Sequence, residues 1–225
     1  MENIVFTFNQ DIVDKAIEFE MFRERCKAFL KAHEIDFDKF TIVSHDAFLG
    51  YVSEQIIKEY ILQLSLEDPI EVKTWDSAHN LDEIKKIITA EMVGIDEIAK
   101  VKEYFYDKYD IEIIKNGKST FFDVKTALTQ KEPKPNWNFL YPVIQANNIG
   151  KDYMVLIYYI TKVDDPKTGP TKMVLIGYIG EDVIKKCHII RKGEMTRFRT
   201  VSQTENYETE IGIHYGDLNE LINKL

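Results

Sequence analysis

The first hundred residues carry apolar side chains at helical spacing. From Asp11 to His33 the apolar positions recur every three or four residues, which predicts a helix with one buried stripe. A second pattern of this kind runs from a cap at Ser44 to about Leu64. A third helical region begins after Asn80 and is expected to break near Gly94. The N-terminal part of the chain is therefore expected to be mainly helical.

The second half of the chain changes to the pattern of β-strands. Ile111 to Lys115 and Thr120 to Ala127 are rich in β-branched and aromatic residues, and Asn116-Gly117 between them is the strongest short-range signal for a hairpin. Two dense apolar runs, Tyr153 to Val163 and Met173 to Ile179, predict central strands of a sheet. A short helix is expected to close the chain. Together these elements predict an α/β fold.

Composition limits the class of protein. The chain has 225 residues, of which 44% are hydrophobic and 30% charged, which suffices for one large domain or two small ones. Cys26 and Cys187 lie far apart in sequence and predict neither a disulfide framework nor a Cys-based metal site. No apolar run approaches the roughly 20 residues that span a bilayer, and the N-terminus lacks the pattern of a secretory signal. We therefore expect a cytoplasmic protein without a membrane segment.

The net charge of −9 is unevenly distributed along the chain. The acidic excess lies in the first 110 residues, whereas residues 131–200 hold twelve Lys and Arg against seven Asp and Glu. Binding to phosphates depends on where the basic side chains lie as well as on their total number. The acidic total argues against nonspecific polyanion binding, but it is compatible with a local DNA-binding surface.

Two charged residues in the second strand of the hairpin are expected to share one face. Side chains at i and i+2 of a strand point the same way, so Asp123 and Lys125 lie together while Phe122 and Val124 face apolar packing. Asp110 opens the neighbouring strand and is expected to approach Asp123. Paired carboxylates are ligands for Mg²⁺, and an adjacent ammonium group can position water and offset charge on a phosphate. The pattern predicts a metal-dependent site for phosphoryl chemistry.

Asp110, followed after the hairpin by Asp123-Val124-Lys125, resembles the signature of the PD-(D/E)xK nuclease superfamily. The order of a helix bearing Glu97, two strands, a crossover and a third strand is similar to the common core of that superfamily, over about residues 95–180. The resemblance is closest to type II restriction endonucleases. It implies a mixed sheet flanked by helices and Mg²⁺-dependent hydrolysis of double-stranded DNA, in which Mn²⁺ can substitute. It also implies catalysis by Asp110, Asp123 and Lys125, with the metal held by both aspartates and supported by Glu97.

The signature leaves alternatives open. Tyr109 stands where the name of the motif carries proline, and Asp107 is a rival for the first acidic ligand. Glu71-Val72-Lys73 also has the pattern of a strand, with Asp46 as its upstream acid, but no crossover and central strand follow it. The other acidic-x-Lys sequences fall in a helix, where i and i+2 do not share a face, or in loops with proline. The copy at Asp123 is therefore the expected site.

Two stretches of the basic region are candidates for DNA binding. The polar loop after the catalytic strand and the stretch around Phe198 combine cationic, amide and aromatic groups, which can contact phosphates or base edges. A solvated loop or edge strand has a similar composition, so the pattern alone leaves both interpretations open. The candidates are Lys131, Lys134, Asn136, Trp137, Asn138, Arg197 and Arg199.

We expect two parts in the chain. Residues 1–80 form a helical region that recognises DNA, dimerises or covers the core, and residues 81–225 form a restriction-endonuclease-like catalytic domain. Cutting both DNA strands with one site per subunit requires two sites related by a twofold axis, so a homodimer is expected. The expected function is that of a site-specific enzyme of a restriction-modification system. The alternatives are a structure-selective or repair nuclease on the same core and a catalytically silent DNA-binding or interaction module.

Overall fold

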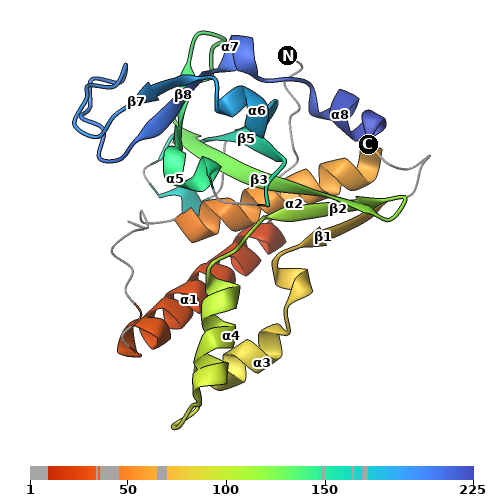
Figure 1. The fold of residues 1–225 in the computed structure, drawn as a ribbon, viewed down its shortest axis with the longest axis vertical. Coiled ribbons are helices and arrows are strands. Elements are labelled where there is room, and N and C mark those ends of the chain that lie inside the picture. Colours follow the sequence, from red (N-terminus) through yellow and green to blue (C-terminus); the bar gives the residue numbers. More distant parts are fainter. Residues whose placement is uncertain are drawn as a thin grey trace.

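A mixed five-stranded sheet forms the centre of the structure (Figure 1). The structure is a computed structural model, and it describes residues 10–33, 35, 46–64, 70–147, 150–163, 165–168 and 172–225. The strand order is β1-β2-β3-β5-β6. The first three strands form an antiparallel meander, β5 runs parallel to β3, and β6 runs antiparallel to β5. The bounds are β1 (Glu71–Thr74), β2 (Ile111–Lys115), β3 (Lys118–Thr129), β5 (Tyr153–Ile160) and β6 (Lys172–Gly180).

The predicted hairpin between β2 and β3 is confirmed. Asn116 and Gly117 have φ angles of 53° and 74°, which match a tight hairpin turn and which Asn and Gly adopt more readily than other residues. The turn sets the register that pairs Ile111 with Phe122. The same register brings Asp110, one residue before β2, level with Asp123 on β3.

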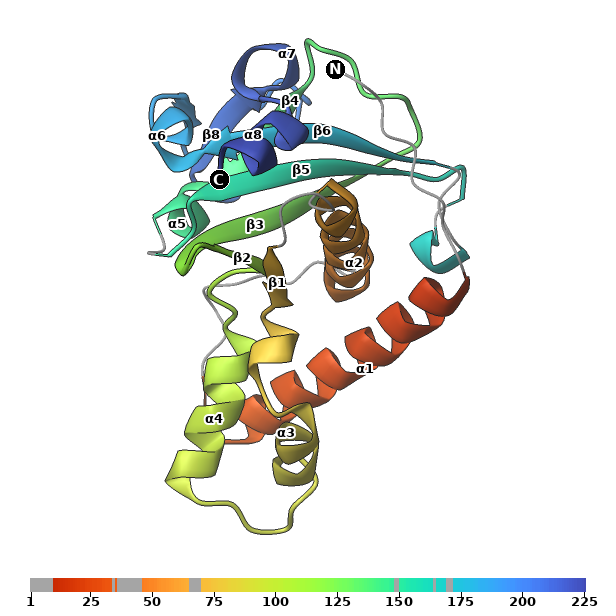
Figure 2. The same ribbon diagram turned by 90° about the vertical axis from the view of Figure 1, so that its right-hand side faces the viewer.

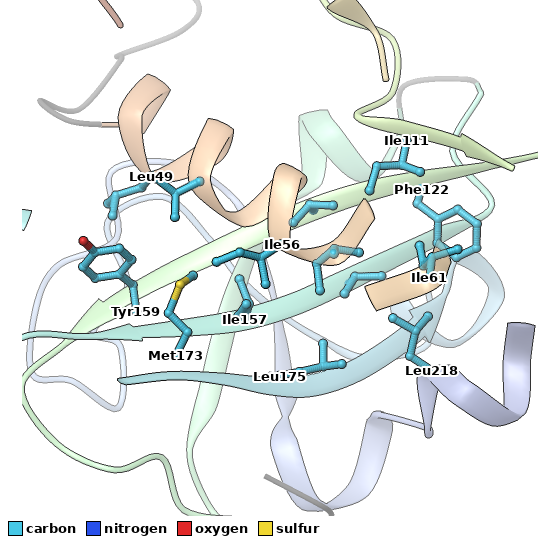
Figure 3. Close-up of a cluster of buried hydrophobic side chains, with 14 of the residues drawn as sticks. Leu49, Ile56, Ile61, Ile111, Phe122, Ile157, Tyr159, Met173, Leu175 and Leu218 are labelled. Atoms are coloured by element: carbon cyan, nitrogen blue, oxygen red, sulfur yellow. The ribbon is translucent and has the colours of Figure 1, made fainter. Parts of the chain in front are cut away.

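One face of the sheet is covered by α2 (Asp46–Leu64), which α1 (Gln10–Ala32) and α8 (Leu218–Lys224) flank (Figure 2). The apolar stripe of α2 packs against the strands and forms the main core, because strand residues of alternate positions point to this side. The labelled side chains of Figure 3 belong to this core: Leu49, Ile56, Ile61, Ile111, Phe122, Ile157, Tyr159, Met173, Leu175 and Leu218.

The opposite face of the sheet is covered by a second, three-stranded sheet of order β4-β8-β7 and by short helices. The sequence analysis did not identify this sheet, because its strands have three to five residues and bury polar side chains such as Asn138, Glu208 and Thr209. The strands and short helices on this face are β4 (Asn138–Pro142), α5 (Val143–Ala146), α6 (Glu181–Ile184), β7 (His188–Ile190), β8 (Asn206–Glu210) and α7 (Ile211–His214).

A helical unit with its own small core extends from the sheet, at the bottom of Figure 2. It contains part of α1, η1 (Asp76–Ala78), α3 (Leu81–Ile87) and α4 (Ile95–Phe105). Gly94 is the N-cap residue of α4, so the expected break in this helical region is confirmed. A further short helix, η2 (Pro166–Thr168), lies in the connection between β5 and β6.

Two expectations about organisation are corrected. The chain does not divide near residue 80, because α2 lies in the main core and β1 pairs with β2 in the central sheet. The run around β6 is not a central strand but the last strand of the sheet. Its apolar character reflects burial on both faces, and part of its outer edge is closed by two backbone hydrogen bonds between Tyr178 and Gly216, of 3.0 and 2.8 Å. Within the described part of the chain, no helix has the length and apolar composition of a membrane span.

Candidate active site

The carboxylate of Asp123 is the centre of a buried polar cluster, with only 1% of its side chain exposed. The ammonium group of Lys125 lies 3.0 Å from each of its two oxygens. The hydroxyl of Tyr141 donates a hydrogen bond of 2.7 Å to Oδ2, and Lys151 donates to Oδ1. Two cations and one neutral donor therefore converge on one buried carboxylate.

Three parts of the chain bring these groups together. Asp123 and Lys125 follow the alternation of β3 and point away from α2, as expected, while Phe122 and Val124 lie in the core beneath that helix. Tyr141 comes from β4 of the small sheet, and Lys151 lies directly before β5, the parallel neighbour of β3. The site is thus formed where the crossover connects the two parallel strands.

Asp110 adjoins Asp123 on the side of β2. Its backbone N–H donates to the carbonyl of Phe122 at 2.9 Å, and its Oδ2 accepts from the backbone N–H of Val124 at 2.5 Å. Because β2 begins only at Ile111, the side chain of Asp110 takes the position beside β3 that a further strand residue would occupy. This arrangement holds a second buried carboxylate next to Asp123.

Glu54 on α2 is a third acidic residue of this region, and the sequence analysis did not identify it. It lies half-buried within electrostatic reach of Asp110, and the neighbouring Ser53 packs over β3 with a 2.7 Å hydrogen bond to Thr126. The sequence signal that could have identified Glu54 is its position next to the apolar stripe of a predicted helix. The strand that this helix would cover was not evident from the sequence.

The charges of the cluster are unevenly compensated. Burial alone would raise the pKa of Asp123. The charges of Lys125 and Lys151 and the hydrogen bonds from Lys151 and Tyr141 outweigh burial and lower the pKa of this carboxyl below its usual value. Burial and then the charge of Asp123 raise the pKa of Asp110 to about 7. Burial and the nearby charge of Asp110 also raise the pKa of Glu54 well above its usual value. The negative charges of Asp110 and Glu54 are therefore less fully compensated than that of Asp123.

The carboxylate oxygens fit a hard divalent cation that is coordinated by few protein groups. Among the described residues, no three His, Cys, Asp or Glu side chains gather closely enough to hold a metal ion by themselves. Mg²⁺, however, is commonly bound through one or two carboxylates and retains several waters. Asp110 and Asp123 provide two adjacent carboxylates, and a cation beside them would offset the repulsion that contributes to the raised pKa of Asp110.

The other acidic candidates have partners outside the buried cluster, although Asp107 lies within electrostatic range of Asp110. Glu97 caps α4 by accepting a 2.7 Å hydrogen bond from the N–H of Gly94, at the end of the helical unit that is remote from the sheet (Figure 2). The expectation that Glu97 supports the metal is therefore replaced by a structural role. Asp107 is half-exposed and lies 3.8 Å from Arg23, so Asp110 is the acidic residue bonded to β3.

The rival motif lies on the edge strand β1. Lys73 and Glu71 pair with each other at 3.0 Å, and 58% of the Glu71 side chain is exposed to solvent. An exposed pair of this kind contributes little and lacks the low dielectric of a buried site. The structure thus distinguishes two copies of the same three-residue pattern by burial, which favours Asp123.

The candidates for DNA binding in the loop before β4 separate into two groups. Lys131, Lys134 and Asn136 are exposed. Trp137 is half-buried against Tyr158, with 5.8 Å between the ring centroids. Asn138 is buried at the start of β4 and donates a 3.0 Å hydrogen bond to Glu208 of β8. Asn138 therefore joins the two strands and is not available to base edges in this conformation.

The basic stretch around Phe198 forms a tight turn in the connection between β7 and β8. Met195 and Val201 form a bridge, and Thr196 N–H donates to the carbonyl of Thr200 at 2.8 Å. Arg199 is exposed at the turn, whereas Arg197 lies 3.3 Å from Glu208 and 3.8 Å from Glu210. Of the two arginines, Arg199 is the better placed for a partner, because Arg197 already faces two carboxylates.

Comparison of the chain with models of protein families, with curated proteins and with solved structures found no match. The fold and the side-chain cluster around Asp123 are therefore the basis on which its function is argued.

Proposed function

We propose that this protein is a Mg²⁺-dependent nuclease that hydrolyses phosphodiester bonds of double-stranded DNA. The observation that carries the proposal is the buried cluster of Asp123, Asp110 and Lys125, in which two carboxylates adjoin and one ammonium group lies 3.0 Å from the oxygens of Asp123. Acidic and basic groups are costly to bury unless they are paired or used. A cluster of this kind at the end of a strand pair is typical of a site for metal-assisted chemistry.

The order of elements supports the same superfamily as the motif. The helix α2 is followed by the meander β1, β2 and β3, then by a crossover and by β5 parallel to β3. This order is similar to the common core of PD-(D/E)xK nucleases, with α2 in the place that the sequence analysis assigned to the helix bearing Glu97. Glu54 on α2 then takes the supporting acidic position beside Asp110.

In this proposal the residues have separate roles. Asp110 and Asp123 hold the metal ion, with Glu54 nearby, and Lys125 orients a water molecule and offsets charge on the phosphate. When bound, Mg²⁺ would lower the pKa of a water molecule and neutralise negative charge on the scissile phosphate. The water oxygen forms a bond to phosphorus and loses its proton, while one sugar oxygen leaves phosphorus and is protonated. The products are one phosphate monoester end and one hydroxyl end.

The finer part of the proposal is a type II restriction endonuclease that acts as a homodimer at a specific sequence. Exposed Lys131, Lys134 and Arg199 are the basic side chains that would contact DNA phosphates. Twofold symmetry of the protein would match the two strands of a palindromic site. Mn²⁺ is expected to substitute for Mg²⁺, because both prefer oxygen ligands.

Digestion of phage DNA with purified protein in Mg²⁺ and in EDTA tests the proposal. Asp123→Asn removes a charge that holds the metal, so cleavage should collapse and recover in part at raised Mg²⁺. Lys125→Ala removes a group that acts on water and phosphate, so cleavage should fall without rescue by metal while DNA binding persists. Discrete fragments indicate a site-specific enzyme, whereas cutting of branched or damaged DNA alone indicates a structure-selective one.

Glu71→Gln and Lys73→Ala are matched controls, because they alter the same three-residue pattern on the exposed edge strand. Both should leave cleavage unchanged. Loss of cleavage in these two variants with full activity of the Asp123 and Lys125 variants would move the site to β1. Full activity of all four variants, or no Mg²⁺-dependent cleavage by the native protein, would contradict the nuclease proposal and favour a silent DNA-binding module.

A further inference from the structure

Lys151 is held opposite Asp123 by a firmly anchored piece of backbone. The next residue, Asp152, donates its N–H to the carbonyl of Phe121 at 2.9 Å, and its side chain accepts from the N–H of Phe121 at 2.8 Å. A third hydrogen bond, of 3.2 Å, joins the carbonyl of Asp152 to the N–H of Glu181. These contacts tie the start of β5 to β3 and to the start of α6, so the ammonium group of Lys151 points into the cluster with 14% of its side chain exposed.

The carboxylate of Asp123 has no acceptor position left for a cation. A carboxylate offers about four lone-pair positions. Lys125 contacts both oxygens, Tyr141 donates to Oδ2 and Lys151 donates to Oδ1. A divalent cation can therefore bind Asp123 only if one of these donors leaves.

Lys151 is the donor whose contact with Asp123 is most easily broken. Tyr141 is buried on β4, where its ring lies in a core cluster. Lys125 contacts both oxygens of Asp123 and lies 5.9 Å from the centroid of the Tyr141 ring. Lys151 contacts a single oxygen, at the end of a long and flexible side chain. A divalent cation beside Asp123 would also repel its ammonium group at short range.

We propose that Lys151 is an exchangeable counter-ion, which neutralises Asp123 in the metal-free protein and moves to a DNA phosphate when the divalent cation binds. This inference rests on the proposed function. Before binding, Lys151 neutralises the buried carboxylate and competes with the metal. After binding, the metal takes the place of the ammonium group at Asp123. A phosphate of the substrate then replaces Asp123 as the negatively charged partner of Lys151. The protein thereby couples metal binding to its grip on DNA.

Titration of the metal-free full-length protein with Ca²⁺ and Mn²⁺ by calorimetry tests the competition without any cleavage. Lys151→Gln removes the competing charge, so both cations should bind about tenfold or more tightly than they bind the native protein, since one short-range repulsion at a partly buried site is lost. Lys151→Arg keeps the charge and should bind them with nearly native affinity. Lys185→Gln is the matched control, because Lys185 forms an exposed pair with Glu181 and should not affect metal binding.

Affinity for a mixed-sequence linear DNA duplex, measured in EDTA and in Ca²⁺, tests the second step. Lys151→Gln should leave binding in EDTA unchanged and weaken binding in Ca²⁺ about threefold or more, because only the metal-bound state frees the ammonium group. A loss of the same size in both conditions would indicate a merely structural role and would overturn the inference. Unchanged binding in both conditions would overturn it as well.

Asp123→Asn separates failure of this inference from failure of the proposed function. If Asp123→Asn abolishes metal binding while Lys151→Gln binds the cations as the native protein does or more weakly, the metal site stands and the role of Lys151 falls. If the native protein and Lys151→Gln both bind no cation, or if Asp123→Asn binds them with native affinity, the proposed metal site falls and the inference falls with it. If Lys151→Gln does not fold, Lys151→Arg still tests the inference. Because this variant keeps the positive charge, a metal affinity that differs from native would contradict competition between Lys151 and the metal.

Discussion

Replacing Asp110 by Asn should stabilise the metal-free protein while abolishing the DNA cleavage that we propose. Asn keeps the size of the side chain and an oxygen that can accept the hydrogen bond from Val124, but it cannot carry the charge that burial and Asp123 oppose. Stability and function therefore place opposite demands on this position. A buried carboxylate that lowers the stability of the metal-free protein is expected at a functional site.

The magnitude follows from the raised pKa of Asp110, which is about 7 against an ordinary value of 3.8. The folded protein holds a proton on this group between about pH 4 and pH 7 and the unfolded chain does not, so stability falls as the pH rises through this window. The full difference corresponds to roughly 4 kcal/mol at pH 8. That pKa already includes the attraction of Lys125 and Lys151. Asn replaces the acid by an amide whose N–H groups also need partners when buried, so we expect a gain of about 1–3 kcal/mol rather than the full difference.

Urea unfolding in EDTA at pH 4.5 and pH 8 measures this effect. Asp110→Asn and the native protein should have similar free energies of unfolding at the lower pH, and the variant should be more stable at the higher pH. Asp82→Asn is the control, since the side chain of Asp82 is 86% exposed beside Lys85, and it should leave the free energy of unfolding nearly unchanged at both pH values. A variant that is no more stable than the native protein at pH 8, or a difference that is the same at both pH values, would refute the reasoning.

The remaining predictions concern the other charges. Asp123→Asn leaves two ammonium groups in the cluster without their counter-ion, so it should lower the free energy of unfolding of the metal-free protein by about 2–4 kcal/mol in urea; unchanged stability would mean that the ion pairs are not formed. Glu54→Gln should weaken Mn²⁺ binding severalfold in calorimetry, whereas Glu97→Gln should not, and the reverse would return the supporting role to α4. Arg199→Ala and Lys134→Ala should each reduce the salt slope of DNA binding by about 1, and unchanged slopes would place the DNA surface elsewhere.

The two aspartates of the motif are expected to differ in how the loss of their charge affects stability. From the motif alone, Asp110 and Asp123 form a pair of like charges, and the loss of one charge is expected to relieve repulsion. That argument holds for Asp110, whose pKa is raised. It is wrong for Asp123, because Lys151 and Tyr141 join Lys125 around it and lower its pKa. Neither Lys151 nor Tyr141 belongs to a pattern that connects it with Asp123 along the chain.

The sequence by itself determined what depends on neighbours along the chain. The alternation of β3 set Asp123 and Lys125 on one face, and Asn116-Gly117 set the hairpin register that brings Asp110 level with Asp123. The helical periodicity predicted α1 and α2, and Gly94 predicted the break before α4. These features are local, since side-chain direction and turn geometry follow from a few consecutive residues.

Only the tertiary structure decided which distant elements meet at the site. Glu54 lies within electrostatic range of Asp110 because α2 packs across the sheet, and Lys151 contacts Asp123 because β5 pairs in parallel with β3. Burial, which separates the motif at Asp123 from the copy at Glu71, also depends on what covers each strand. Packing between elements is a property of the whole chain, and the periodicity of one segment does not contain it.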